Sequence, residues 1–114
     1  MQYINVATEY SRTPGARYES EGEFSGERFR KDILIPKLES MDIKTSKPFT
    51  ELLTINLDGS AGYGSGWLEE VFGGLIRDGF DWIHLQRVLL IVSKEEPYLV
   101  EEIWDYIDDA NDNR

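Results

Sequence analysis

Segments with the residue pattern of β-strands alternate along this chain with segments whose apolar residues recur at helical spacing. Residues 2–9 are β-prone and predict a first strand. Residues 51–57 are apolar except for Thr54 and Asn56, which predicts a second strand in the centre of a sheet. Residues 87–92, all apolar after the first, predict a third.

Helical spacing follows each predicted strand. Ser25 has the chemistry of an N-cap and Glu27 suits the first turn of a helix, which Pro36 should kink or tighten. The apolar face of this helix is predicted to be Phe29, Ile33, Leu34 and Leu38. A long loop, residues 11–24, precedes it, and residues 41–50 form a polar connector after it.

The second predicted helix follows a glycine-rich turn and ends at Gly79, a natural C-terminal cap. Its inward positions are Leu68, Val71, Phe72, Leu75 and Ile76. Gly73 and Gly74 inside it cost about 1 kcal/mol each relative to alanine, so we expect close packing there.

The third predicted helix opens with Ser93-Lys94-Glu95-Glu96, the pattern of a capping box, and with Pro97 in its first turn. Its inward positions are Leu99, Val100, Ile103 and Ile107. We expect the acidic end from Asp105 to Arg114 to fray.

The order β-α-β-α-β-α predicts the α/β fold class, with a mainly parallel sheet, packed helices and right-handed crossovers. The 114 residues suit one small domain, predicted over residues 1–110, with residues 111–114 as a frayed acidic C-terminal end.

Cysteine is absent, which excludes disulfides and thiol chemistry. No secretory signal and no membrane-spanning apolar run are present, so we expect a cytoplasmic protein without membrane contact.

Charge is divided unevenly along the chain. Residues 1–50 hold equal numbers of acidic and basic residues, so the net charge of −10 lies in residues 51–114. Nucleic acid is therefore not an expected partner, because phosphate contacts need a basic patch. The acidic half is either a solvated surface or a surface that attracts a basic protein.

The turn at residues 58–66, Asp-Gly-Ser-Ala-Gly-Tyr-Gly-Ser-Gly, joins the second strand to its helix. Such dense glycine indicates positive φ angles or a close approach of the backbone to another group. Ser65 stands where an N-cap belongs, so it is a structural cap, an anion site or a target for a regulatory phosphate. The spacing of Gly62, Gly64 and Gly66 does not match a dinucleotide fingerprint, and no lysine follows as a P-loop requires.

Enzyme chemistry has no support in this sequence. The single histidine, His84, lies in an apolar context typical of a packed or surface side chain. The C-terminal carboxylates, Asp105, Asp108, Asp109 and Asp112, lack EF-hand spacing. The tryptophans, Trp67, Trp82 and Trp104, are expected in the core unless one marks an interface. We predict no catalytic residue, no metal and no cofactor.

Two segments carry a family resemblance. Ile55 to Gly59 and Gly64 to Leu68 resemble the strand, turn and helix of STAS domains, the fold of bacterial anti-anti-sigma factors. With residues 25–30 and 68–75, the chain resembles more closely the STAS-like domains of unknown function, over about residues 3–107.

The resemblance implies a non-catalytic signalling module. In STAS proteins a serine at this helix start is phosphorylated by an ATP-binding serine kinase that acts as an anti-sigma factor. Ser65 matches that serine, although Tyr63 and Gly64 stand where anti-anti-sigma factors carry an acidic residue and a serine.

These observations select one interaction surface and one secondary candidate. The first is the glycine turn and the start of its helix: Gly62, Tyr63, Gly64, Ser65, Gly66, Trp67 and Glu69. The second is the loop before the first helix, with Arg17, Tyr18, Ser25 and Arg30, where each arginine binds an anionic group or pairs with carboxylates of its own domain. Two alternatives stay open: an acidic inhibitor or immunity protein that binds through residues 95–112, and a small-ligand sensor.

Overall fold

Three parallel strands form the sheet of this protein. The computed structural model describes residues 2–41 and 51–114. In that part of the chain β1 (Gln2–Asn5), β2 (Leu53–Asn56) and β3 (Leu89–Val92) pair side by side with β2 in the centre. The parallel sheet and the central position of the second strand are confirmed, although each strand is shorter than predicted.

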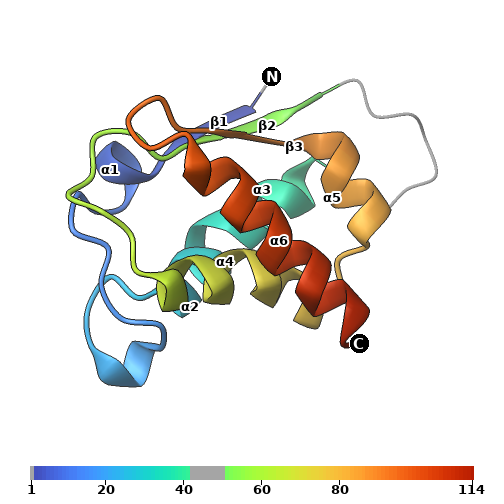
Figure 1. The fold of residues 1–114 in the computed structure, drawn as a ribbon, viewed down its shortest axis with the longest axis horizontal. Helices are drawn as coiled ribbons and strands as arrows, with labels where there is room; N and C mark the ends of the chain where they lie inside the picture. The colour runs from blue at the N-terminus through green and yellow to red at the C-terminus, as the bar shows by residue number, and fades with distance from the viewer. Residues whose placement is uncertain (1, 42–50) are drawn as a thin grey trace.

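The long helices lie against one face of this sheet (Figure 1). That face contributes Ile4, Ile55 and Ile91, which are paired in register and buried. On the opposite face Tyr3 and Leu90 stay about half exposed. The protein is thus a two-layer α/β domain, as the β-α order predicts.

The first strand stops at Asn5 because a short helix, α1 (Val6–Glu9), begins there. The Asn5 carboxamide accepts a hydrogen bond from the Thr8 amide at 2.9 Å, and the Glu9 carboxylate accepts one from the Asn5 amide at 2.7 Å. The predicted strand over residues 2–9 is therefore wrong beyond Asn5, because reciprocal capping overcomes the β-propensity of Val6 and Thr8.

The first predicted helix is present in three parts, α2 (Gly26–Phe29), a π-helical turn η2 (Arg30–Leu34) and α3 (Ile35–Ser40). Ser25 is its N-cap, as predicted, and accepts from the Arg28 amide at 3.1 Å. Pro36 has no amide hydrogen to donate, and the π turn ends two residues before it, close to where the helix was expected to change. The preceding loop contains a 3-10 turn, η1 (Glu19–Glu21). Most of the predicted connector, residues 42–50, lies outside the described residues.

Helix α4 (Ser65–Arg77) ends at a glycine cap, as predicted. Gly79 has φ +98°, and the amides of Gly79 and Phe80 donate to the carbonyls of Ile76 and Leu75 at 3.0 Å. This pair of hydrogen bonds is a Schellman motif.

Helix α5 (Trp82–Val88) was not predicted and contains the first two residues of the predicted third strand. It begins at Asp81, whose carboxylate accepts from the Ile83 amide at 2.8 Å.

Helix α6 (Tyr98–Asp112) begins later and ends later than predicted. The Ser93 hydroxyl accepts from the Glu96 amide at 3.0 Å, but helical structure starts only after Pro97. The expectation of fraying from Asp105 is wrong, because α6 continues to Asp112 and Arg114 donates to the Phe80 carbonyl at 3.1 Å. The domain limit at residue 110 stays a prediction.

The apolar faces of the helices and of the sheet meet in one core. Among the described residues, no helix is long and apolar enough to cross a membrane. The largest side chains in this core that are almost fully buried are Trp67, Phe29, Phe72, Ile4, Leu34 and Leu38.

Candidate functional site

The glycine turn connects β2 to α4 and is tied to the loop that precedes α2. Gly59 and Gly62 have φ angles of +95° and +141°, which L side chains rarely adopt. The Ala61 amide of the turn donates to the Arg12 carbonyl of the loop at 2.7 Å. The two predicted candidate surfaces are therefore neighbours.

Ser65 is the first residue of α4 and not its cap. The N-cap is Gly64, and no side chain caps this helix. Ser65 is exposed, and its hydroxyl interacts with Tyr106 of α6. Burial of Tyr106, together with its hydrogen bond to Glu102, raises the pKa of the phenol to about 12. The predicted capping role of Ser65 is wrong because glycine supplies the extended N-cap conformation, which leaves the serine hydroxyl outside the capping position.

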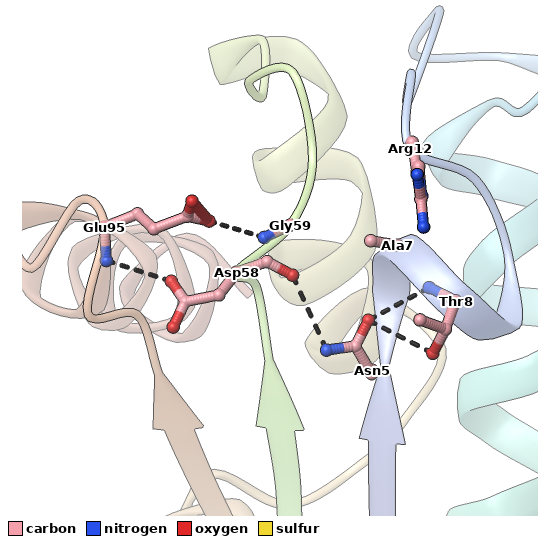
Figure 2. A pocket seen from close by; sticks show the side chains of 7 residues that line it. All are labelled: Asn5, Ala7, Thr8, Arg12, Asp58, Gly59 and Glu95. Carbon is pink, nitrogen blue, oxygen red and sulfur yellow. Dashed lines mark hydrogen bonds between the residues drawn. The ribbon is translucent and has the colours of Figure 1, made fainter.

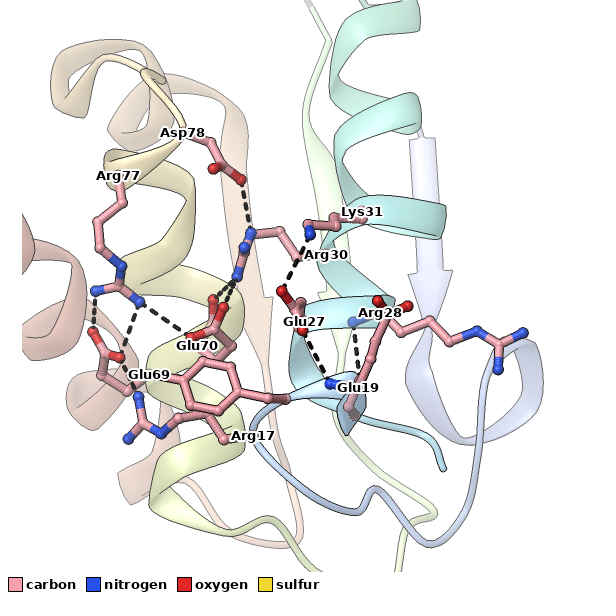
Figure 3. A network of polar contacts seen from close by, with 12 residues as sticks. Arg17, Glu19, Glu27, Arg28, Arg30, Lys31, Glu69, Glu70, Arg77 and Asp78 are labelled. Carbon is pink, nitrogen blue, oxygen red and sulfur yellow. Dashed lines mark hydrogen bonds and ion pairs between the residues drawn. The ribbon is translucent and has the colours of Figure 1, made fainter. Parts of the chain in front are cut away.

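Arg17 lies over the first turns of α4. Its guanidinium contacts the Glu69 carboxylate at 2.7 Å, and a Cβ at residue 66 would lie only 3.2 Å from its Nε atom. Gly66 thus leaves room for Arg17. Glu69 also pairs with Arg77 at 2.7 Å (Figure 3). The hydrogen bond from Arg77, aided by Arg17, lowers the pKa of Glu69 although partial burial opposes this.

Arg30 is a buried structural residue and not a surface anion receptor. Its guanidinium contacts the carboxylate of Glu70 at 2.5 Å and that of Asp78 at 2.8 Å, and it also donates to the Glu70 carbonyl (Figure 3). Burial disfavours the charge, but these partners raise the pKa of Arg30 overall. A Cβ at residue 74 would come within 2.7 Å of its Cζ atom, so Gly74 makes room for this group.

Three residues of the predicted surfaces, Trp67, Tyr63 and Ser25, are largely buried and stabilise the fold. Trp67 is 1% exposed, and its indole N–H donates to the Phe24 carbonyl at 3.0 Å. The Tyr63 hydroxyl donates to the Leu57 carbonyl at 2.8 Å, and burial raises its pKa to about 12. Ser25 is fully buried in its cap. The side chain of Trp67 is therefore unavailable to a partner, contrary to the interaction surface predicted from the sequence.

Two exposed aromatic residues lie on the loop instead. Tyr18 is 44% exposed, and the Arg17 guanidinium lies 5.9 Å from its ring centre. Phe24 is 37% exposed and has φ +55°, which is strained for an aromatic residue. Sequence reasoning named Tyr18 but missed Phe24, whose only signal was an apolar side chain between polar neighbours. We call the set Arg17, Tyr18, Phe24, Gly64, Ser65 and Glu69 the Ser65 face.

A cavity of about 270 Å³ lies elsewhere, where the three strands end (Figure 2). Its walls come from α1, from the start of the glycine turn and from the loop after β3. Sequence reasoning missed this cavity, although polar residues at or soon after the strand ends were a usable signal. The lining residues are Asn5, Ala7, Thr8, Arg12, Asp58, Gly59 and Glu95.

The other candidates have structural positions. His84 lies on α5 and is half-buried, and the Trp82 indole donates to the Asp108 carboxylate at 2.7 Å. Trp104 packs against the core. Within residues 2–41 and 51–114, no group of three or more acidic or histidine side chains is arranged to hold a metal ion.

Comparison with known proteins adds one finding. The sequence model of the STAS-like domain of unknown function (DUF4325) matches residues 25–98. This segment includes α2, α4 and the turn with Ser65. No curated protein and no solved structure matches the chain significantly.

Proposed function

Because this chain belongs to the family of STAS-like domains of unknown function, we propose that it is a non-catalytic, cytoplasmic interaction module that binds a protein through the Ser65 face. The observation that carries the proposal is the position of Ser65. It is exposed at the start of a 13-residue helix that no side chain caps. A phosphate on this serine would meet the positive end of the helix dipole and its free amides.

A phosphate on Ser65 would change the ion pairs of Arg17. The guanidinium packs on Gly66, next to Ser65, and holds Glu69. Guanidinium groups bind phosphate with two parallel hydrogen bonds, so a phosphate on Ser65 would compete with Glu69 for Arg17. Glu69 and Glu102 would at the same time repel the phosphate. The modification therefore rearranges charge at the surface while the buried pair of Arg30 is left intact.

The expected partner is an ATP-binding serine kinase of the anti-sigma type, by analogy with other STAS proteins. The exposed ring of Tyr18 lies beside the Arg17 guanidinium, and the exposed ring of Phe24 adds apolar contact area on the same loop. Interfaces often combine aromatic anchors with arginine in this way.

Capture from lysate of the source cell, with matched variants, tests the proposal. Ser65→Asp places a negative charge on the face, whereas Ser40→Asp places one at the exposed end of α3. We expect a protein that wild type and Ser40→Asp retain equally and that Ser65→Asp binds at least about tenfold more weakly or more tightly. The phosphate switch is wrong if Ser65→Asp retains every partner as wild type does. The Ser65 face as a whole is wrong if a Tyr18→Ala and Phe24→Ala double variant also binds normally.

A second function is favoured by α6. Its exposed carboxylates recur one turn apart at Glu101, Asp105 and Asp109. Like charges at this spacing disfavour a helix, and a basic partner, such as a toxin that this protein inhibits, would compensate for that cost. Such a complex would weaken steeply as salt is added.

A further inference from the structure

We propose that the cavity at the ends of the three strands binds a small zwitterion, a molecule that carries one carboxylate and one ammonium group. The cavity is distinct from the Ser65 face, so this inference does not depend on the proposed interaction module. It rests on the position of the cavity, on the order of its walls and on the opposite charges that face it.

The position is one that α/β proteins commonly use for ligands. In a parallel sheet the strands all end at one edge, so the loops that follow them lie near one another there. Asn5 ends β1, Asp58 lies two residues beyond β2, and Glu95 lies three residues beyond β3. Figure 2 shows these residues around the cavity, with Arg12 and Thr8 on the side of α1.

The acidic wall is held in place by the backbone. The Asp58 carboxylate accepts hydrogen bonds from the amides of Lys94 and Glu95 at 3.0 Å. The Glu95 carboxylate in turn accepts one from the Gly59 amide at 2.5 Å. The bonds from the amides of Glu95 and Lys94 lower the pKa of Asp58, so this wall is negative at neutral pH. A preorganised wall costs little ordering entropy when a ligand binds.

The opposite wall carries a positive charge. Arg12 is exposed, and its guanidinium forms no ion pair with any of the described residues. Its backbone is held in place by the hydrogen bond from the Ala61 amide to the Arg12 carbonyl. The Thr8 hydroxyl, bonded to the Asn5 side chain at 3.2 Å, lies on the same side of the cavity. The Arg12 guanidinium suits a carboxylate, and the second oxygen of Glu95 suits an ammonium group.

The size of the cavity fits an amino acid. A volume of about 270 Å³ equals about nine water molecules at roughly 30 Å³ each. A free amino acid such as leucine has a similar number of non-hydrogen atoms. Because Ala7 and Gly59 contribute the least polar part of the lining, a short apolar stem between the two charges is also accommodated.

The inference is tested with the whole protein and defined probes. Amide NMR spectra are recorded while glycine, L-alanine and L-leucine are each added to about 10 mM, enough to detect a Kd near 1 mM. Acetate and ethylamine, each with one of the two charges, are the matched probes. Arg12→Gln and Glu95→Gln remove one charge from each wall and keep a hydrogen-bonding side chain. Arg87→Gln removes an exposed arginine on α5, away from the cavity.

We expect saturable shifts at Thr8, Arg12, Gly59 and Glu95 with at least one amino acid. Loss of either wall charge should weaken this binding about tenfold, whereas Arg87→Gln should leave it unchanged. The inference is overturned if no amino acid produces saturable shifts there, if acetate or ethylamine alone binds as well, or if both wall variants bind like wild type.

Discussion

Two arginines that appear equivalent in the sequence have opposite roles in the structure. Arg17 and Arg30 each pair with one of two adjacent glutamates on α4. Consecutive residues on a helix point about 100° apart, so Glu70 faces the interior while Glu69 lies at the partly exposed edge of α4. Only 6% of the Arg30 side chain is exposed, compared with 35% for Arg17.

The difference in burial determines what each pair can do. Arg30 satisfies three acceptors, and both it and Glu70 are shielded from water. Removing either partner therefore leaves a buried charge whose remaining counter-charge, Asp78 or Arg77, is partly exposed. Arg17 shares Glu69 with Arg77 and can exchange that partner for another anion at little cost. Arg30 is therefore fixed in the fold, whereas Arg17 is the arginine suited to a switch.

The largest effect is expected from breaking the buried pair. Glu70→Ala should lower the free energy of unfolding by about 3–5 kcal/mol, because Arg30 then loses its buried counter-charge. Urea denaturation followed by tryptophan fluorescence measures this. An Arg30→Met and Glu70→Leu double variant should recover much of the loss. A loss below about 1 kcal/mol for Glu70→Ala is typical of an exposed ion pair and would contradict the assignment of Arg30–Glu70 as a buried pair that stabilises the fold.

A smaller effect is expected at the glycines beside these pairs. Gly74→Ala should destabilise the protein by about 1–3 kcal/mol, because its methyl group would overlap the buried guanidinium of Arg30. In Gly73→Ala the new methyl group meets the Glu69 carboxylate, the partly exposed end of a flexible side chain that can move away. The gain of about 1 kcal/mol in helix propensity should therefore offset the contact. Equal thermal unfolding temperatures for the two variants would contradict this difference.

Arg17→Ala should cost less than about 1 kcal/mol of stability, because the pair is partly exposed and Arg77 still holds Glu69. Denaturation in low and high salt measures it, and the small loss should shrink further as salt screens the charges. Binding of the partner, in contrast, should change strongly. A stability loss as large as that of Glu70→Ala would show that Arg17, like Arg30, is needed for the fold.

The pH dependence of Glu69 gives the smallest expected effect. Its pKa is lowered in the folded protein, so its ion pairs stabilise the fold above the unfolded pKa of about 4.3. This contribution is lost as the pH falls through the folded pKa. The stability difference between wild type and Glu69→Gln should therefore shrink below about pH 4.3 in acid titrations. A difference that stays constant down to acid unfolding would contradict the assignment.

The features that the sequence predicted correctly depend on local signals. Ser25 caps α2, Gly79 ends α4 with positive φ, and β2 occupies the centre of the sheet, as expected for a segment that is apolar except for Thr54 and Asn56. Each follows from a residue type whose conformational preference no neighbour opposes.

The features that it missed depend on tertiary contacts or on competing local signals. Asn5 could continue a strand or cap a helix, and Asp81 could end a turn or begin α5. Trp67 could have been an exposed anchor, but its indole N–H binds a carbonyl 43 residues away. The cavity combines loops from three strand ends, so no single motif indicated it.

Hydrogen exchange of the complex with the captured partner tests the central claim most directly, because it locates the interface without any substitution. The account predicts slower exchange for residues 62–70 and for the loop that carries Tyr18 and Phe24. Protection confined to residues 95–112 would contradict it and would assign the function to the acidic face of α6.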